Sequence, residues 1–375
     1  MKKIKVLSLI WSMGAGGAQQ ILINYLRDFQ YDDDIEFKVC VYTEPTESKY
    51  DREIRAKGYN VEYLNNPKSP FNIPYIKRYF NLAVAKEAWS RAIEEYKPDI
   101  VHVHISSLLI ATMPGIIANN VPVIFDTLHS NPYRYKGRVR RAISEAFLKY
   151  GVVPICITEE QVKQAKDWYG IAQYEVLHNG IDIKNIQSKI ISKDVARKKF
   201  EIDENAYVIA GVGRLNPIKR FDWLISIFKK VKEKVPNAKL VIAGDGSERK
   251  RLLQIAKSSN VKQDIQFLGN IDNVIDLYCA ADVLAITSYT EASSLVAIEA
   301  QTCGLRCVMS DGVPSDSIVT SNTQKLWVNA TEDDWCKALL NDKYVGKPMA
   351  QKEDYEVHSM SQKLKRIYLK YYARG

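Results

Sequence analysis

Short apolar runs alternate along the chain with longer segments whose apolar residues recur at helical spacing. In the first half, the apolar runs predict strands at Ile4–Ile10, Phe37–Tyr42, Ile100–His104, Val121–Leu128, Val153–Thr158 and Tyr174–Leu177. Helices are predicted between them, as at Gln19–Phe29 and Ile76–Tyr96. Continuous apolar runs are typical of parallel strands that are buried on both faces. This alternation therefore predicts a parallel sheet with right-handed crossovers.

The second half repeats the alternation with a new set of strands. They are predicted at Tyr207–Val212, Leu240–Ala243, Ile265–Leu268, Val283–Thr287 and Cys307–Ser310. Two such series predict an α/β protein with two doubly wound, Rossmann-like domains. The turn-prone sequence Asn179-Gly180-Ile181-Asp182 marks the boundary, so the predicted domains are residues 1–180 and 181–355. Apolar residues recur at helical spacing in Val357–Tyr372, and we expect a helix within 356–375 to pack back on the first domain.

Composition narrows the class of protein. The 375 residues, 46% of them hydrophobic and 26% charged, suit two globular domains. No apolar run approaches the roughly 20 residues that span a bilayer, and Ile4–Ile10 is too short for a secretion signal. The six cysteines lack zinc-ligand spacing, so we expect buried free thiols and a reducing compartment. The expected location is the cytoplasm.

A net charge of +9 favours anionic partners. No nucleic-acid-binding signature is present, so we expect no nucleic-acid partner. Within Arg134–Tyr150, basic side chains surround an apolar stripe; they are Lys136, Arg138, Arg140 and Arg141, and the stripe is Val139, Ile143, Phe147 and Tyr150. This segment is either a helix that rests on anionic lipid at the inner face of the cell membrane or a core-packed helix with a solvated basic face.

Two loops that follow predicted strands are suited to an anion. Gly14-Ala15-Gly16-Gly17-Ala18-Gln19 follows the first strand and opens a helix, where backbone N–H groups can approach a phosphate. The same sequence also suits a simple tight turn. In Gly213-Arg214-Leu215-Asn216-Pro217-Ile218-Lys219, the guanidinium and the ammonium are suited to grip a diphosphate. The alternative for this loop is a solvated basic surface.

The segment from Ser288 to Glu299 carries the strongest signal. Glu291 ends a strand and its loop, and a helix is predicted to start near Ser294. The backbone amides of Leu295 and Val296 can then receive phosphate oxygens. Glu299 lies about one turn further on, among apolar residues, where a carboxylate can accept hydrogen bonds from two ribose hydroxyls. A buried carboxylate without a partner would be costly, so Glu299 needs one.

In order along nearly the whole chain, these motifs resemble those of the retaining GT-B glycosyltransferases of family 4. That family has a glycine pair after the first strand, a G-R-L-x(4)-K motif, a G-D-G turn and an E-x(7)-E motif. The matching residues are Gly16-Gly17, Gly213-Arg214-Leu215 with Lys219, Gly244-Asp245-Gly246, and Glu291 with Glu299. The segment that begins at Val313-Pro314-Ser315 and runs to Trp335 is similar to the bacterial exopolysaccharide (EpsF-like) branch.

The resemblance implies a GT-B fold, in which an acceptor-binding domain and a nucleotide-sugar-binding domain face each other across a cleft. The implied catalytic residues are His129, Glu291, Arg214 and Lys219. The implied donor-binding residues are Gly16, Gly17, Arg214, Lys219, Gly244, Asn270, Ile271, Glu291, Ser294, Leu295, Val296 and Glu299. His104 aligns with a family histidine near the acceptor. For His129 and His104, and for the neighbouring His102, the alternative is a histidine that is simply hydrogen-bonded.

The implied reaction is transfer, with retention, of a hexose or N-acetylhexosamine from a nucleotide sugar, expected to be a UDP-sugar, to a glycan or lipid-linked acceptor in bacterial surface polysaccharide synthesis. We expect no metal or other cofactor, because fixed cations and helix amides can stabilise the departing diphosphate and Asp32-Asp33-Asp34 is expected in a surface turn. Two other functions stay open: a nucleotide-sugar epimerase and a non-catalytic nucleotide-sugar-binding protein.

The sequence departs from the family pattern at two places. Ala292-Ser293 follows the first motif glutamate where the family usually has glycine and then a bulky residue, which bears on the identity of the donor sugar. Arg306 replaces the usual proline after Cys303-Gly304-Leu305, without an evident functional meaning.

Overall fold

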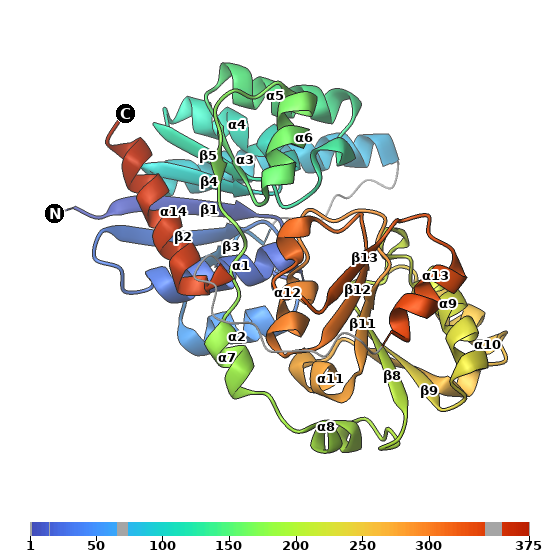
Figure 1. Ribbon diagram of the computed structural model, residues 1–375. Coiled ribbons are helices and arrows are strands. Elements are labelled where there is room, and N and C mark those ends of the chain that lie inside the picture. The colour runs from blue at the N-terminus through green and yellow to red at the C-terminus, as the bar shows by residue number, and fades with distance from the viewer. Residues whose placement is uncertain (1, 15, 66–73, 342–354, 375) are drawn as a thin grey trace. The chain divides into compact units, whose positions relative to one another are not determined.

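The computed structural model describes residues 2–14, 16–65, 74–341 and 355–374 (Figure 1). Ala15 of the glycine-rich motif and residues 342–354 of the predicted second domain lie outside the described residues, as does Gly375. By its contacts the chain forms two compact units: unit 1 is Met1–Gly180 with Val357–Gly375, and unit 2 is Ile181–Glu356. The sequence prediction likewise drew a boundary after residue 180 and assigned the C-terminal helix to the first domain.

Unit 1 contains a seven-stranded parallel sheet with the order β3-β2-β1-β4-β5-β6-β7. Its strands are β1 Ile4–Ile10, β2 Ile35–Val41, β3 Val61–Tyr63, β4 Ile100–His104, β5 Val123–Thr127, β6 Val153–Cys156 and β7 Glu175–Val176. Its helices are α1 Gly17–Phe29, α2 Lys49–Lys57, α3 Pro74–Tyr96, α4 Leu109–Ala118, α5 Gly137–Lys149, α6 Glu159–Tyr169 and α14 Val357–Tyr372. Short 3₁₀ helices, η1 Ser106–Leu108 and η2 Pro132–Arg134, connect strands to helices.

Unit 2 contains a six-stranded parallel sheet with the order β10-β9-β8-β11-β12-β13. Its strands are β8 Tyr207–Val212, β9 Ala238–Ala243, β10 Ile265–Gly269, β11 Val283–Ile286, β12 Arg306–Ser310 and β13 Thr323–Leu326. Its helices are α7 Ile183–Ser188, α8 Lys193–Lys199, α9 Phe221–Lys234, α10 Arg249–Lys257, α11 Val274–Ala280, α12 Leu295–Thr302 and α13 Glu332–Leu339. The 3₁₀ helices are η3 Pro217–Lys219, η4 Lys262–Asp264 and η5 Ser315–Ser317.

Helices cover both faces of the unit 2 sheet (Figure 1). Ile209 in β8 packs with α9, α10 and α13 in one apolar cluster. Its neighbours Val208 and Ala210 pack with α11 and α12 in a second cluster. Successive side chains of a strand point to opposite faces, so a strand between two helical layers must be apolar throughout. The prediction of two Rossmann-like α/β domains from such runs is confirmed.

The amphipathic stripe of α5 faces the protein core. Ile143 and Phe147 belong to the core cluster of unit 1, and Val139 packs against it. The guanidinium of Arg140 lies 4.1 Å from the ring centroid of Trp168, and its Nε donates to the carbonyl of that residue at 2.9 Å. The structure therefore supports the core-packed alternative for this segment and not an apolar stripe that rests on lipid.

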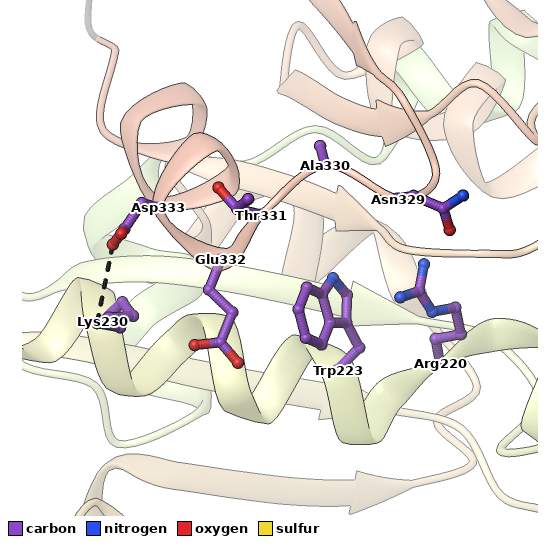
Figure 2. A pocket seen from close by; sticks show the side chains of 8 residues that line it. All are labelled: Arg220, Trp223, Lys230, Asn329, Ala330, Thr331, Glu332 and Asp333. Carbon is purple, nitrogen blue, oxygen red and sulfur yellow. Dashed lines mark ion pairs between the residues drawn. The ribbon is translucent and has the colours of Figure 1, made fainter.

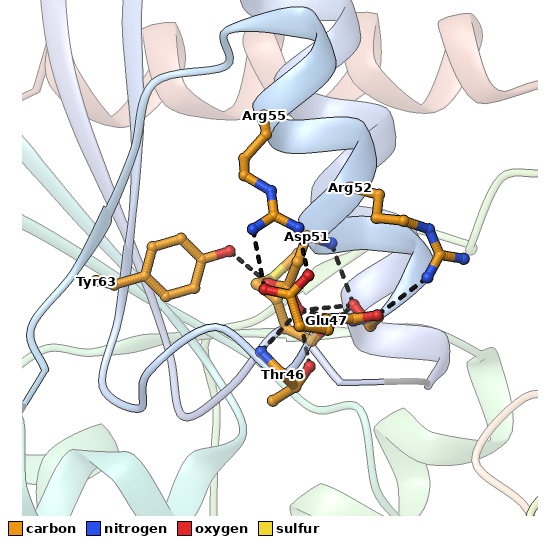
Figure 3. Close-up of polar contacts among 8 residues, drawn as sticks. Thr46, Glu47, Asp51, Arg52, Arg55 and Tyr63 are labelled. Atoms are coloured by element: carbon orange, nitrogen blue, oxygen red, sulfur yellow. Dashed lines mark hydrogen bonds and ion pairs between the residues drawn. The ribbon is translucent and has the colours of Figure 1, made fainter.

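A polar cluster in unit 1 stabilises the start of α2 (Figure 3). The carboxylate of Asp51, only 2% exposed, accepts hydrogen bonds from the backbone N–H and hydroxyl of Thr46 and from the hydroxyl of Tyr63, which lies at 2.6 Å. Ser48 completes a capping box with Asp51. Burial raises the pKa of this carboxyl, but the hydrogen bonds outweigh burial and hold the pKa below its usual value. The contacts between Ser48 and Asp51 are explained by helix capping.

Candidate functional site

The predicted donor-binding residues of unit 2 gather at one edge of its sheet. All strands are parallel, so the loops after β8, β9, β10, β11 and β12 leave from the same edge. The chain runs from β8 outward through β9 to β10 and then crosses to β11 on the other side of β8. The switch point between β8 and β11 is where doubly wound sheets bind their ligands. Lys219 follows β8 and Glu291 follows β11, so these two residues flank the switch point.

Glycines let the loops of this edge pack more closely than side chains would allow. Gly244, with φ of 133°, follows β9, and a Cβ there would lie 2.0 Å from the carbonyl oxygen of Gly213. A Cβ on Gly246 would lie 2.3 Å from the carbonyl oxygen of Leu215. The backbone N–H of Gly244 donates to Gly269 at 2.7 Å. The G-D-G turn is therefore required for the contact between the loops after β8, β9 and β10.

The loops after β8 and β11 are joined by a lysine–glutamate pair. Lys219 Nζ lies 2.7 Å from Glu291 Oε1, and the two side chains are 22% and 6% exposed. The hydroxyl of Ser288 donates to the same carboxylate oxygen at 2.6 Å, and the backbone N–H of Glu291 donates to Gly312 at 2.9 Å. The hydroxyl of Thr287 donates to the carbonyl of Lys219 at 2.9 Å. The structure thus brings two predicted catalytic residues together and leaves the lysine partly open to solvent.

The N-terminus of α12 is not capped by a side chain. Its N-cap residue, Ser294, makes no side-chain cap hydrogen bond, and the first turn holds no acidic residue. The Oγ atom of Ser294 is buried and has no hydrogen-bond partner within the described part of the chain. By contrast, α13 carries a complete capping box between Thr331 and Asp334. The first amides of α12, on Leu295 and Val296, therefore stay suited to an anion.

Glu299 has the partner that its apolar surroundings require. The hydroxyl of Tyr278, from α11, lies 3.4 Å from Glu299 Oε2. Burial, with the nearby charge of Glu299, raises the pKa of the Tyr278 phenol well above its usual range, so this hydroxyl remains a hydrogen-bond donor. Glu299 itself is only partly buried, at the switch-point side of unit 2.

Three further predicted donor-binding residues lie on loops of the same edge. Arg214 and Asn270 are exposed after β8 and β10, respectively. Ile271 is partly buried and packs against the core cluster beneath α11 and α12. Arg214 is not part of the Lys219–Glu291 ion pair.

In unit 1 the switch point lies between β1 and β4. Gly17 begins α1 after the N-cap residue Gly16, and no side chain caps this helix either. His104 ends β4, and Ile105 directly after it has φ of 97°, a strained value for a β-branched residue.

Three of the five histidines of unit 1, His102, His104 and His129, form a chain of contacts. His102 lies 2.6 Å from the hydroxyl of Tyr368 in α14 and 2.7 Å from that of Thr127. His104 Nδ1 lies 3.0 Å from His129 Nε2, so one of these rings donates to the other. The Nε2 atom of His104 is buried without a partner among the described residues. The side chain of His104 is fully buried, and its place near the acceptor stays a prediction.

Burial keeps these histidines neutral. It lowers the pKa of His102 to about 3 and that of His129 to about 4, and the pKa of His104 falls well below the usual value. In the neighbouring strand, burial raises the pKa of the Asp126 carboxyl well above its usual range. For His102 the hydrogen-bonded alternative describes the structure. For His129 the predicted catalytic role stays a prediction.

Sequence reasoning missed the residues that hold the two motif glutamates. Ser288 is three residues before Glu291 at a strand end, and Gly312 accepts the backbone N–H of Glu291 from the loop after β12. A hydroxyl at a strand end beside an acidic residue was an available signal for Ser288. No signal pointed to Gly312, because it lies on a different loop.

Arg306 has a structural role. Its side chain is buried and donates to the carbonyl of Ala338 at 3.0 Å, to the carbonyl of Leu339 and to the hydroxyl of Tyr207 at 3.1 Å. It therefore satisfies the C-terminal carbonyls of α13.

The described residues hold neither a metal-ligand cluster nor a membrane-spanning helix. No cluster of three or more histidine, cysteine, aspartate or glutamate side chains in this part of the chain is arranged to hold a metal ion. Likewise, no described helix combines the length and apolarity needed to cross a membrane. All six cysteines are free.

Comparison with known proteins covers both units. Residues 15–185 match the family model described as Glycosyltransferase Family 4, and residues 192–350 match the one described as Glycosyl transferases group 1. EpsF of Bacillus subtilis (strain 168), a glycosyltransferase candidate by name, is 23% identical over 318 residues, which are 82% of this chain and 79% of EpsF. A UDP-Gal:alpha-D-GlcNAc-diphosphoundecaprenol alpha-1,3-galactosyltransferase of Escherichia coli is 25% identical over 274 residues, 68% of this chain and 70% of the relative.

Among solved structures, Anabaena Alr3699/HepE in complex with UDP-glucose superposes with a TM-score of 0.81 at 19% sequence identity. The match covers 98% of this chain and 100% of that one. At this level of identity, the likeness establishes the fold of the whole chain.

Proposed function

This chain belongs to glycosyltransferase family 4 and has the GT-B fold, which makes it a transferase, and we propose that it moves a sugar from a UDP-sugar with retention of anomeric configuration. The acceptor would be a glycan or a lipid-linked sugar of bacterial surface polysaccharide synthesis, as the names of the relatives suggest. We propose that the transferred group is a hexose or an N-acetylhexosamine. We also propose that the enzyme acts at the cytoplasmic side of the cell membrane. Membership in glycosyltransferase family 4 leaves the alternative function, a nucleotide-sugar epimerase, without support.

The Lys219–Glu291 pair is the single observation that carries this proposal. It places a partly exposed ammonium and a nearly buried carboxylate within 2.7 Å of each other at the switch point of unit 2. The ammonium would bind the diphosphate of the donor, and the carboxylate would orient hydroxyls of the transferred sugar. The uncapped start of α12 and the exposed guanidinium of Arg214 would add positive charge around the same diphosphate.

These groups favour a reaction without a metal ion. When the bond to the sugar breaks, negative charge grows on the β-phosphate, and fixed cations and amides stabilise that charge without reorganising. No side chain is evident as a general base, so we propose that the leaving phosphate takes the proton of the attacking hydroxyl. Glu299, held by Tyr278, would accept hydrogen bonds from the ribose hydroxyls. The acceptor would be bound mainly by unit 1, and His129 would face the donor sugar.

The test is to follow diphosphate release from a panel of UDP-, GDP- and ADP-sugars, with and without membrane-derived acceptor extract and with or without EDTA. We expect UDP release from one UDP-sugar, stimulated by acceptor and insensitive to EDTA, and an α-linked product from an α-linked donor by NMR. Tight UDP binding without any release, even with acceptor extract, would favour the non-catalytic binder. Binding to anionic liposomes in flotation at low salt would support peripheral membrane contact through the basic side chains of unit 1.

A further inference from the structure

A second cavity lies in unit 2, between α9 and the segment that leads into α13 (Figure 2). Its volume is about 480 Å³, within the roughly 300–1,000 Å³ typical of small-molecule sites. One side is lined by Arg220 and Trp223 and, about two turns after Trp223 along α9, by Lys230. Residues 329–333 line the other side. We call this cavity the α9–α13 groove.

The charges of the groove balance. Arg220 and Lys230 face Glu332 and Asp333, and the nearest pair, Lys230 with Asp333, is separated by 3.9 Å. The guanidinium of Arg220 also donates to the carbonyl of Val328 at 2.7 Å. The N-terminus of α13 is capped by its own side chains and carries three acidic residues in its first turn. A phosphate would gain little here, so the groove is suited to a neutral polar ligand.

The ring of Trp223 gives the groove its apolar surface. The Arg220 guanidinium lies 4.3 Å from the ring centroid of Tyr289 and 5.2 Å from that of Trp223, which holds all three planar groups together. Figure 2 shows the nitrogen edge of the Trp223 indole turned toward the side where Asn329 and Ala330 lie. The indole nitrogen is buried and makes no hydrogen bond to any described residue. A ligand in the groove would therefore contact the ring of Trp223 and not this nitrogen.

The groove borders the loops to which we assign the donor. Arg220 directly follows Lys219, and Tyr289 is two residues before Glu291. The backbone N–H of Tyr289 donates to Ile218 at 2.8 Å, so the loops after β8 and β11 are joined at this point. A molecule in the groove would therefore lie next to the Lys219–Glu291 pair within the same unit.

We propose that the α9–α13 groove binds neutral saccharide units of the glycan on which this enzyme acts. A pyranose has an apolar face of C–H groups, which packs on an aromatic ring, and a rim of hydroxyls without charge. Asn329 can both donate to and accept from such hydroxyls, and Glu332 can accept from two of them. The identity of the occupant rests on the proposed glycosyltransfer, whereas its chemistry follows from the groove alone.

The test uses the full chain labelled with ¹⁵N-tryptophan, titrated with neutral oligosaccharides of glucose, galactose and N-acetylglucosamine from disaccharides to hexasaccharides. Trp223→Phe assigns the Trp223 indole signal. We expect one sugar series to shift this signal saturably, while the signals of Trp89 and Trp335 stay in place. Those two indole nitrogens also lack partners among the described residues, but both side chains are 0% exposed in the cores. They are therefore internal controls.

Asn329→Ala and Glu332→Gln should each weaken this binding by about two- to tenfold, the effect of one hydrogen bond. Glu332→Gln keeps an oxygen for the hydroxyl of Ser226, which donates to Glu332, so the fold is expected to survive. Glu160→Gln, at an exposed site on α6, is the charge-matched control and should change nothing.

The proposal is overturned if none of the sugars moves the Trp223 signal, if both groove variants bind as tightly as the unchanged protein, or if glucose 6-phosphate binds more tightly than neutral sugars. UDP is titrated into the same samples. If the protein neither binds UDP nor releases it from a donor, the donor proposal is wrong. The saccharide titration can still be interpreted in that case. If UDP release is normal and no sugar shifts the Trp223 signal, only the saccharide-binding proposal for the α9–α13 groove is wrong.

Discussion

Replacing Lys219 with alanine removes the cation that joins the two loops of the donor site. The loss leaves the Glu291 carboxylate, 6% exposed, with the Ser288 hydroxyl as its remaining side-chain donor. Truncating one member of a fully buried ion pair costs about 3–5 kcal/mol. The Lys219 side chain is 22% exposed, so water can replace part of the lost interaction. We therefore expect the free energy of unfolding to fall by about 1–3 kcal/mol.

The effect on turnover should be larger than the effect on UDP affinity. A preorganised charge aimed at a developing anion is worth about 10²–10³ in rate. The β-phosphate carries more negative charge as the sugar leaves than in the bound donor, so only part of this stabilisation is present before reaction. We expect Lys219→Ala to lower kcat by about 10²–10³ and to weaken UDP binding by roughly tenfold or less. Lys219→Arg keeps the charge and should retain intermediate activity.

The assay is UDP release from the preferred donor, alongside calorimetric titration with UDP and thermal unfolding. Lys232→Ala is the matched control, because Lys232 is 20% exposed and lies 2.8 Å from Asp264 in the same unit. This control should lose stability without losing kcat. If Lys219→Ala keeps kcat within about threefold of the unchanged enzyme while Lys232→Ala behaves alike, the phosphate-binding role of Lys219 is wrong.

Three further predictions follow from contacts in the two units. Glu299→Gln keeps an oxygen for the Tyr278 hydroxyl but removes the charge, so the UDP affinity measured by calorimetry should fall about 10- to 100-fold. As a control, the affinity for 2′,3′-dideoxy-UDP, which lacks the ribose hydroxyls, should show no such loss. Burial lowers the pKa of His102 from 6.5 to about 3, so the unfolded chain binds more protons below pH 6.5. The free energy of unfolding should then decrease as pH falls from 6.5 toward 4, by about 1.4 kcal/mol per pH unit for each buried histidine. The raised pKa of Asp126 acts in the opposite sense and reduces this slope. A flat profile in urea titrations across this range would contradict the prediction. Gly244→Ala places a methyl 2.0 Å from a carbonyl oxygen and should cost about 3 kcal/mol or more, whereas Gly58→Ala, with open space around it, should cost about 1 kcal/mol in the same unfolding assay.

The central strands were predictable because burial on both faces leaves a continuous apolar run. β1, β4 and β8 have the predicted bounds. The edge strands β3 and β13 were missed, since Val61–Tyr63 and Thr323–Leu326 are short and only partly buried. An edge strand has one neighbour and a partly solvated surface, so its sequence need not be apolar.

The site was predictable residue by residue but not as a set of contacts. Lys219 and Glu291 each followed from a motif, yet their ion pair depends on two loops that are adjacent only through the order of strands in the sheet. Likewise, apolar neighbours showed that Glu299 needs a partner, but Tyr278 comes from another helix. The departure at Arg306 was visible in the sequence, and only the packed carbonyls at the end of α13 explain it.

Two helix starts of unit 2, those of α12 and α13, differ in how their first amides are satisfied. Acidic residues near a helix start are favoured wherever no ligand competes. The start of α13 follows this rule with the Thr331 cap and three acids in its first turn, Asp334 among them. The start of α12 does not: it lacks a side-chain cap and an acid, and the Ser294 hydroxyl is buried without a partner among the described residues. Leaving amides uncapped costs about 1 kcal/mol or more. We therefore propose that an anionic substrate satisfies the amides of α12, which favours α12 for the donor diphosphate and leaves the neutral sugars beside α13.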